Sequence, residues 1–150
     1  MEILLQAMIF VMGCSLGSFV NMLLYRSAVG EDKQKNKVLK KVSKDGKESR
    51  SFCDFCGRQL RWYENIPVIS WVIQGGKTKC CGKPLPYSYP AVELVTGILI
   101  LINFRFQFLG PEVFLNWQFW VALAAETVII TMLVFEAYFD LTYMLLPDFS

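Results

Sequence analysis

The chain has 150 residues, of which 54% are hydrophobic and 19% are charged, and its formal net charge is +2. So apolar a composition is unusual for a soluble domain that carries this many charges, unless the two kinds of residue are segregated. They are segregated here: positions 26–83 hold 14 of the 15 basic residues with 6 acidic ones, a net charge of +8. The rest of the chain has one basic and seven acidic residues. This pattern predicts a membrane protein with a separate basic region and disfavours a soluble adaptor.

The first apolar segment, residues 3–25, contains 23 residues and no charge. At about 1.5 Å per residue it crosses a hydrocarbon core of roughly 30 Å, so residues 1–25 are predicted to form a transmembrane helix. A cleaved signal peptide is the alternative, but no basic residue precedes the segment and it is too long for such a signal. Gly13 and Gly17 form a Gly-x-x-x-Gly pair that allows another helix to approach closely, although ordinary packing explains the pair equally well. Cys14 is interpreted as a small buried hydrophobic residue.

Two further transmembrane helices are predicted, at residues 91–109 and 113–140, and a turn at Gly110-Pro111-Glu112 separates them. Arg105 lies near the end of the first of these and can extend its charge to the headgroup region. Trp117 and Trp120 open the second, where tryptophans suit a membrane interface. Residues 141–150 are expected to begin a cytoplasmic connection to a following helix.

The third apolar segment contains carboxylates. Glu126 and Glu136 interrupt it, and both are expected to face protein or water because a glutamate facing lipid is costly. Glu136, Asp140 and Met144 follow one another at a spacing of four, which places them on one helical face. An acid at the edge of a membrane span indicates a functional site, so Asp140 is the first catalytic candidate.

The basic residues also predict the orientation, because such charge is retained on the cytoplasmic side of a membrane. Residues 26–90 are therefore expected in the cytoplasm, with the amino terminus outside and Asp140 at the cytoplasmic face. The Lys-rich part, residues 31–50, has few large apolar residues and is expected to be mobile. It is interpreted either as a solvated tether or as a contact with anionic lipids of the bilayer. Nucleic acid is not expected as a partner, because no aromatic residues are interleaved with the charges.

The second part of the basic region carries a candidate metal site. Cys53-x-x-Cys56-Gly57 is typical of a turn that presents two thiolates to zinc, and Cys80-Cys81-Gly82 follows 24 residues after Cys56. A metal site is favoured over disulfides because the cytoplasm is reducing. The spacing departs from a zinc ribbon, since Thr78 stands where the first ligand of a second Cys-x-x-Cys would be. We expect zinc bound by Cys53, Cys56 and Cys81, with Cys80 as candidate for the fourth ligand in a zinc-ribbon-like fold.

Several motifs occur in order along nearly the whole chain. They are Gly17-Ser18-Phe19-x-Asn21-x-x-x-Tyr25-Arg26, Cys53-x-x-Cys56-Gly57, Leu60-x-Trp62-Tyr63-Glu64-Asn65-Ile66-Pro67-Val68-x-Ser70-Trp71, Gly76-Lys77, Cys81-Gly82-x-Pro84, Tyr89-Pro90-x-Val92-Glu93-Leu94-x-Thr96-Gly97, Asp140 and Leu146-Pro147-Asp148. Together they resemble the bacterial prepilin peptidases, which are bifunctional leader peptidases and N-methyltransferases of type IV pilus, type II secretion and competence systems. Gly17, Ser18, Asn21, Arg26, Trp62, Asn65, Pro67 and Glu93 are interpreted as structural positions of this motif set.

The resemblance implies an aspartyl protease of the bacterial inner membrane. It would cleave the short basic leader of type IV prepilins or pseudopilins at the cytoplasmic face and methylate the new amino terminus with S-adenosylmethionine. In such proteases two carboxylates share a proton and activate water together. Asp140 matches the first catalytic aspartate, and Asp148 and Glu136 are assigned supporting roles; helix capping is the alternative for Asp148. Gly76 and Lys77 are associated by resemblance with methyl transfer.

The chain also departs from the family pattern, in which the second catalytic aspartate follows a Gly-x-Gly motif on a later helix. The 150 residues contain no such motif. Eight helical residues span about 12 Å, so Asp140 and Asp148 are too far apart to share a proton unless Pro147 reverses the chain. We therefore expect the chain to be the amino-terminal part of a longer enzyme and inactive as a protease by itself. A membrane-anchored scaffold or assembly module without catalysis remains the alternative function.

Overall fold

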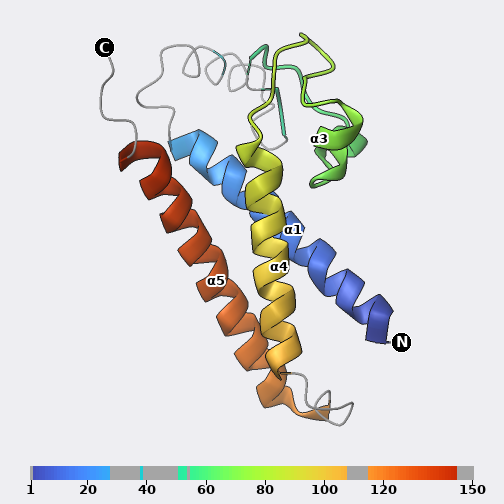
Figure 1. Ribbon diagram of the computed structural model, residues 1–150, viewed down its shortest axis with the longest axis vertical. Helices are drawn as coiled ribbons and strands as arrows, with labels where there is room; N and C mark the ends of the chain where they lie inside the picture. Colours follow the sequence, from blue (N-terminus) through green and yellow to red (C-terminus); the bar gives the residue numbers. More distant parts are fainter. Residues whose placement is uncertain (1, 28–37, 39–50, 54, 108–114, 145–150) are drawn as a thin grey trace.

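The computed structural model describes residues 2–27, 38, 51–53, 55–107 and 115–144. Three long helices form a bundle, and an irregular segment with little regular secondary structure lies at one end of it (Figure 1). The predicted residues 31–50 (apart from Val38), the turn at 110–112 and Asp148 lie outside the described residues. The expected architecture, three membrane helices with a cysteine-containing loop between the first two, is confirmed.

The three long helices are α1 (Glu2–Ser27), α4 (Ser88–Gln107) and α5 (Trp117–Met144). Each is long and apolar enough to cross a membrane, over Glu2–Tyr25, Ser88–Gln107 and Trp117–Thr142. Helix α4 begins at Ser88, before the expected position 91, and Pro90 is tolerated there because the first turn needs no donor from its backbone nitrogen. Helix α5 begins after Asn116, whose side-chain oxygen accepts a 2.9 Å hydrogen bond from the Gln118 N–H and so caps the helix.

Close packing of α1 against α4 depends on glycines. A Cβ placed on Gly13 would lie 2.8 Å from Gly97 Cα, and one on Gly17 would lie 2.7 Å from Glu93 Cα. Such distances leave no room for a side chain, so the two backbones touch at both positions. The Gly-x-x-x-Gly pair is therefore a helix contact. Cys14 is 5% exposed and faces Gly97 within the same contact, as expected for a small buried residue.

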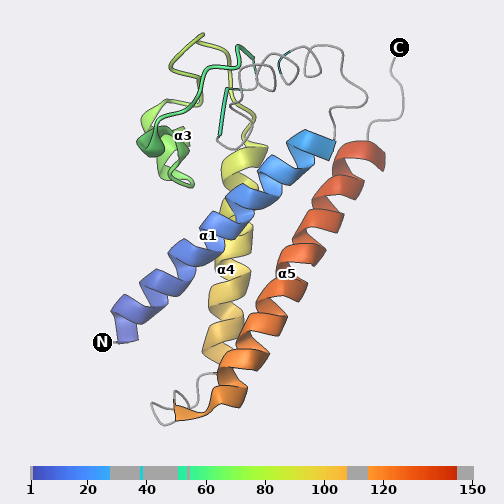
Figure 2. The same cartoon turned by 180° about the vertical axis from the view of Figure 1, so that it is seen from behind.

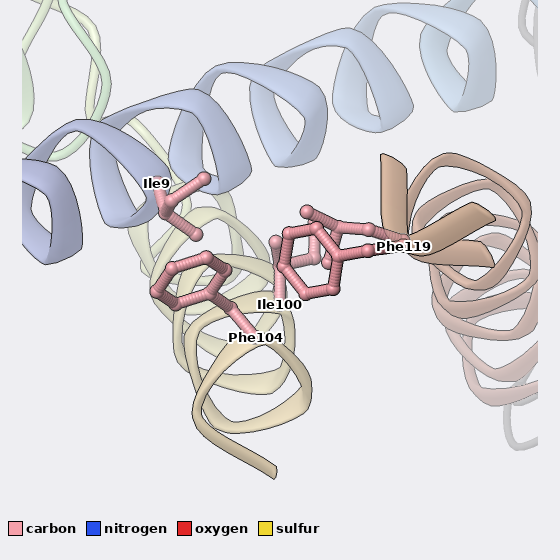
Figure 3. Packing of buried hydrophobic residues seen from close by; sticks show 5 residues of the cluster. Ile9, Ile100, Phe104 and Phe119 are labelled. Atoms are coloured by element: carbon pink, nitrogen blue, oxygen red, sulfur yellow. The ribbon is translucent and has the colours of Figure 1, made fainter. Parts of the chain in front are cut away.

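Helix α5 completes the bundle through an aromatic and aliphatic core. Ile9 from α1, Ile100 and Phe104 from α4, and Phe119 from α5 gather where the three helices meet (Figure 3). The Phe104 and Phe119 rings pack edge to face, with centroids 6.3 Å apart. The outer faces of the helices expose many large apolar side chains, which suits helices surrounded by lipid.

The glutamates of α5 occupy different environments. Glu126 is partly buried and accepts a short hydrogen bond from the Gln107 side chain of α4, whereas Glu136 is exposed one turn before Asp140, which is also exposed. The carboxylate of Glu126 is thus directed at a protein partner.

The segment between α1 and α4 includes residues 51–53 and 55–87, which we call the cysteine module. It contains the short helices η2 (Trp62–Asn65) and α3 (Ile69–Ile73) and two isolated β-bridges, Phe52 to Gln59 and Lys77 to Pro84. The module lies at the end of the bundle where α1 ends and α4 begins (Figure 2). Helix α5 ends at this same end of the bundle, so its last turns, with Asp140, lie on the same side as the module.

Candidate functional site

The cysteine module is built from two turns of the same design. In the first turn the Gly57 N–H donates to the Cys53 carbonyl at 2.9 Å, and the Cys53 N–H donates to the Arg58 carbonyl at 2.8 Å. Gly57 adopts a φ of +73°, the left-handed conformation that glycine tolerates best. This geometry directs the two sulfurs of the Cys-x-x-Cys sequence toward one point.

The second turn repeats the first with a threonine in the first ligand position. The Gly82 N–H donates to the Thr78 carbonyl at 2.9 Å, and the Thr78 N–H donates to the Lys83 carbonyl at 2.8 Å. Thr78 is buried, and its hydroxyl oxygen lies 3.1 Å from Cys81 Sγ. Thr78 is therefore a structural part of the turn, and its side chain touches one sulfur.

Cys80 brings the fourth sulfur to the site. Its Sγ lies 3.4 Å from Cys56 Sγ and 3.8 Å from Cys81 Sγ, and Cys53 Sγ lies 3.8 Å from Cys81 Sγ. All four sulfurs lie within 4.8 Å of one another. The cluster could hold a metal ion, and it joins the four cysteines that the sequence indicated.

The thiols of the cluster differ in acidity. Burial raises the pKa of the Cys53 thiol, and burial also raises the pKa of the Cys56 thiol. Burial opposes ionisation of Cys80 too, but hydrogen bonds from Cys53, Cys56 and Arg58 outweigh it and lower the pKa of Cys80 to about 7. Cys80 is therefore more acidic than Cys53 and Cys56 when no metal ion is bound.

An ion pair between the partly exposed side chain of Arg58 and the buried side chain of Glu64 adjoins the first turn. Glu64 in η2 is 7% exposed, and its carboxylate accepts hydrogen bonds from the Arg58 guanidinium at 2.8 and 3.0 Å and from the Arg61 N–H at 2.8 Å. The Arg61 N–H and then the Arg58 charge hold the pKa of Glu64 below its ordinary value. Because Arg58 follows the first turn directly, Glu64 connects η2 to the cysteine cluster. Glu64 belongs to the motif between Leu60 and Trp71, and no role was predicted for it from the sequence; the opposite charge of Arg58, six residues earlier, was the available signal.

Glu93 of α4 connects the module to the membrane helices. Its carboxylate accepts a 2.6 Å hydrogen bond from the Val68 N–H, and Ser18 of α1 lines the same pocket. Val68 has a φ of +60°, which is rare for a β-branched residue and costs energy that surrounding contacts must offset. Asn21, one turn after Ser18, donates from Nδ2 to the Tyr89 carbonyl at 3.1 Å. Polar groups of α1, α4 and the module thus meet in one place.

These groups line a pocket between the module and the ends of α1 and α4, which we call the module–helix pocket. Its volume is about 170 Å³. Its wall includes polar groups, aromatic rings and two of the cysteines. Among the lining residues are Ser18, Asn21, Tyr25, Phe52, Trp71 and Glu93. The pocket therefore adjoins the candidate metal site directly.

Gly76 and Lys77, associated by resemblance with methyl transfer, lie near this pocket. A Cβ on Gly76, whose φ is +66°, would lie 3.0 Å from the Trp71 ring, and the Trp71 indole N–H donates to the Leu85 carbonyl at 3.4 Å. Gly76 therefore leaves room for the indole that forms one wall of the pocket. Lys77 is exposed in the β-bridge to Pro84.

The remaining predicted positions are dispersed. Trp62 is 81% exposed, Asn65 lines the pocket, and the Pro67 carbonyl accepts a 2.6 Å hydrogen bond from the Ile69 N–H. The backbone of Arg26 belongs to the last turn of α1. Asp140 and Glu136 lie one turn apart on α5, and neither is among the residues that line the pocket.

The chain matches a family model described as the bacterial peptidase A24 N-terminal domain over residues 11–106. It is 32% identical to a prepilin leader peptidase/N-methyltransferase of Myxococcus xanthus over 144 residues, which are 96% of this chain and 36% of the relative. It is 36% identical to a prepilin leader peptidase/N-methyltransferase of Bacillus subtilis, over 66% of this chain and 36% of the relative. It is 27% identical to the enzyme of the same name from Klebsiella pneumoniae, over 93% of this chain and 54% of the relative. No solved structure matches significantly.

The chain thus spans between about a third and a half of the length of these relatives. The region matched by the family model contains the glycine contact between α1 and α4, the whole cysteine module and Glu93. These comparisons confirm the resemblance and favour it over a scaffold without catalysis. The chain belongs to the bacterial peptidase A24 N-terminal domain family.

Proposed function

We propose that this chain contributes to a prepilin leader peptidase/N-methyltransferase of the bacterial inner membrane. The family match over residues 11–106, which contains the four-sulfur cluster and the adjoining pocket, is the observation that carries the proposal. The substrates would be prepilins, the class of substrate that the relatives' names give for those proteins. By the family resemblance, these would be type IV prepilins or pseudopilins. The cysteine module would face the cytoplasm, because the basic residues are concentrated between α1 and α4.

The metal ion would be zinc. Zinc binds thiolates at about 2.3 Å in a tetrahedron, which places neighbouring sulfurs about 3.8 Å apart. The sulfur pairs at 3.4 and 3.8 Å fit this requirement, so Cys53, Cys56, Cys80 and Cys81 would hold the ion. With four protein ligands, the ion would leave no open position, so its role would be to hold the two turns of the module together.

Methyl transfer and proteolysis would take place at different sites. Methyl transfer would take place at the module–helix pocket, where S-adenosylmethionine would supply the methyl group and Gly76 keeps the Trp71 wall in position. Proteolysis would use Asp140 as one of two carboxylates at the membrane edge, with Glu136 and Asp148 in supporting roles. Because the 150 residues contain no Gly-x-Gly motif with an aspartate, we propose that they do not cleave a leader by themselves.

The test uses the purified 150-residue chain in detergent with two substrates. One is a prepilin with its leader; the other is a peptide with the sequence of a mature pilin terminus. Transfer of a radioactive methyl group from S-adenosylmethionine to the mature peptide is expected, without cleavage of the prepilin. Asp140→Asn should leave methyl transfer unchanged.

Cleavage by the native chain that Asp140→Asn abolishes would contradict the proposed inactivity. Absence of methyl transfer from a zinc-loaded, folded chain would contradict the assignment of that activity to these residues.

A further inference from the structure

The module–helix pocket has a distinct acceptor end. Glu93 is 8% exposed and Asn21 is 9% exposed, and both line the pocket. The side-chain amide of Asn21 donates from Nδ2 to the Tyr89 carbonyl. Its Oδ1 atom is buried and has no hydrogen-bond partner among the residues that the structure describes. A buried acceptor without a donor is costly, so this atom indicates a missing ligand group that donates hydrogen bonds.

Glu93 also offers acceptor positions to a ligand group that donates hydrogen bonds. A carboxylate offers about four acceptor positions, and the Val68 N–H uses one of them. The other acidic residue of the pocket wall, Glu64, is paired with Arg58. Of the two glutamates in the pocket wall, Glu93 is therefore the one whose carboxylate has no basic partner among the residues that the structure describes.

The rest of the wall suits a cation with an apolar body. Tyr25, Phe52 and Trp71 contribute aromatic rings, whose faces attract ammonium groups. Lys79 also lines the pocket, but it is exposed and its ammonium lies 5.1 Å from the Tyr63 ring centroid. The volume of about 170 Å³ is comparable to a cavity of about 150 Å³ that accepts benzene. This is room for one amino-acid residue.

We propose that the module–helix pocket binds the α-ammonium group of a polypeptide terminus, through the Glu93 carboxylate and Asn21 Oδ1. An ammonium has several donors and one positive charge, which matches an acceptor end made of one carboxylate and one amide oxygen. The pocket would admit the first residue of the peptide and hold its nitrogen at the junction of α1 and α4. This inference rests on the proposed methyl transfer, since it assigns the site of the methyl acceptor.

Binding can be measured without any reaction. The probe is the tetrapeptide amide leucyl-alanyl-alanyl-alanine, with a free amino terminus or with an acetylated one, titrated into the zinc-loaded full chain in detergent by calorimetry. One charge-assisted hydrogen bond should make the free peptide bind at least about tenfold more tightly than the acetylated one. Glu93→Gln should lower this ratio severalfold, because glutamine can still accept from the Val68 N–H but carries no charge, while Asn21 Oδ1 is unchanged.

Glu126→Gln is the matched control, because it removes a partly buried membrane carboxylate that does not line the pocket; its ratio should remain that of the native chain. Circular dichroism and zinc content confirm that each variant is folded. Equal binding of both peptides to the native chain, no binding of either peptide up to about 10 mM, or a preference that is undiminished in Glu93→Gln would overturn the proposal.

The two proposals can fail separately. Methyl transfer by a chain that shows no preference for the free amino terminus would leave the proposed function intact and refute the ammonium site. A preference that depends on Glu93 in a chain without methyl transfer would support the site and refute the proposed function.

Discussion

The Glu93 carboxylate on α4 accepts a 2.6 Å hydrogen bond from the backbone N–H of Val68, a residue held at a φ of +60°. The bond connects a membrane helix to the cysteine module at a position where the backbone is strained. Glu93 also lies opposite Gly17 of α1, so the same residue contributes to the closest approach of two membrane helices. One buried carboxylate therefore contributes both to the contact between the module and the bundle and to the contact between α1 and α4.

The affinity of the chain for zinc should depend on Cys80. The native chain is expected to bind about one zinc ion, and Cys80→Ser should lower the zinc affinity by tenfold or more, because a thiolate ligand is replaced by a hydroxyl. Competition with a chromogenic chelator measures the affinity. Cys14→Ala is the control, since Cys14 lies in the α1–α4 contact outside the cluster and its loss should leave zinc unchanged. Equal affinity of the native chain and Cys80→Ser would show that Cys80 is no ligand.

A cysteine at position 78 should be able to replace Cys80 as the fourth zinc ligand. Thr78 occupies the place that Cys53 has in the first turn, and its hydroxyl is 3.1 Å from Cys81 Sγ. The double variant Thr78→Cys, Cys80→Ala should therefore recover zinc binding that Cys80→Ala alone loses. The same chelator competition compares the two variants. If the double variant binds zinc no better than Cys80→Ala, the two turns are not equivalent.

Gly17→Ala should destabilise the bundle. Alanine favours a helix over glycine by about 1 kcal/mol, but its Cβ would lie 2.7 Å from Glu93 Cα, and overpacking costs about 1–3 kcal/mol. Since backbone atoms cannot move aside as a side chain can, the clash is expected to dominate and the thermal midpoint in detergent should fall. Ser15→Ala, at an exposed position of α1, should not lower it. An unchanged midpoint for Gly17→Ala would mean that α1 and α4 separate easily.

Gly76→Ala should impair methyl transfer more than Gly75→Ala does. Both glycines have a φ between +60° and +66°, so alanine costs about 1 kcal/mol or more of stability at either position. Only at Gly76 does the new Cβ also meet the Trp71 ring, at 3.0 Å, whereas nothing lies within 4 Å at Gly75. Thermal unfolding and the methyl-transfer assay separate these effects. Equal activity of the two variants would argue against a role for the Trp71 wall.

The stabilisation by Glu64 should depend on pH. The Arg61 N–H and Arg58 hold the pKa of this carboxylate below its ordinary value, so the folded state binds its proton less readily than the unfolded state. The contribution is complete above the ordinary glutamate pKa of about 4.3 and is lost as the pH falls through the lower folded value.

The native chain should therefore melt at a higher temperature than Glu64→Gln at pH 7, and the gap should close below about pH 4. Acid release of a metal affects both proteins, so the difference between them isolates Glu64. A gap that persists unchanged into strong acid would contradict this account.

Much of the fold followed from patterns along the chain. Uninterrupted apolar segments predicted three membrane helices because a span needs about twenty apolar residues, and the structure confirms them. The exact helix start at Ser88 was not predicted, because a proline at position 90 is equally compatible with a loop and with a first helical turn. The four cysteines indicated a metal site, but Thr78 made the spacing irregular.

The sequence by itself determined the number of membrane helices, the basic region between the first two, and the residues able to bind a metal, because hydropathy, charge and ligand chemistry are properties of individual residues. Only the tertiary structure decided that Cys80 joins the other three sulfurs and that Thr78 belongs to the frame of the second turn. It also decided that Asn21 and Glu93, 72 positions apart in the sequence, line one pocket. Such contacts depend on how α1 crosses α4, and that crossing depends on backbone proximity at Gly13 and Gly17. The Gly-x-x-x-Gly pair indicated a close helix contact, but a local pattern does not specify which helix it meets.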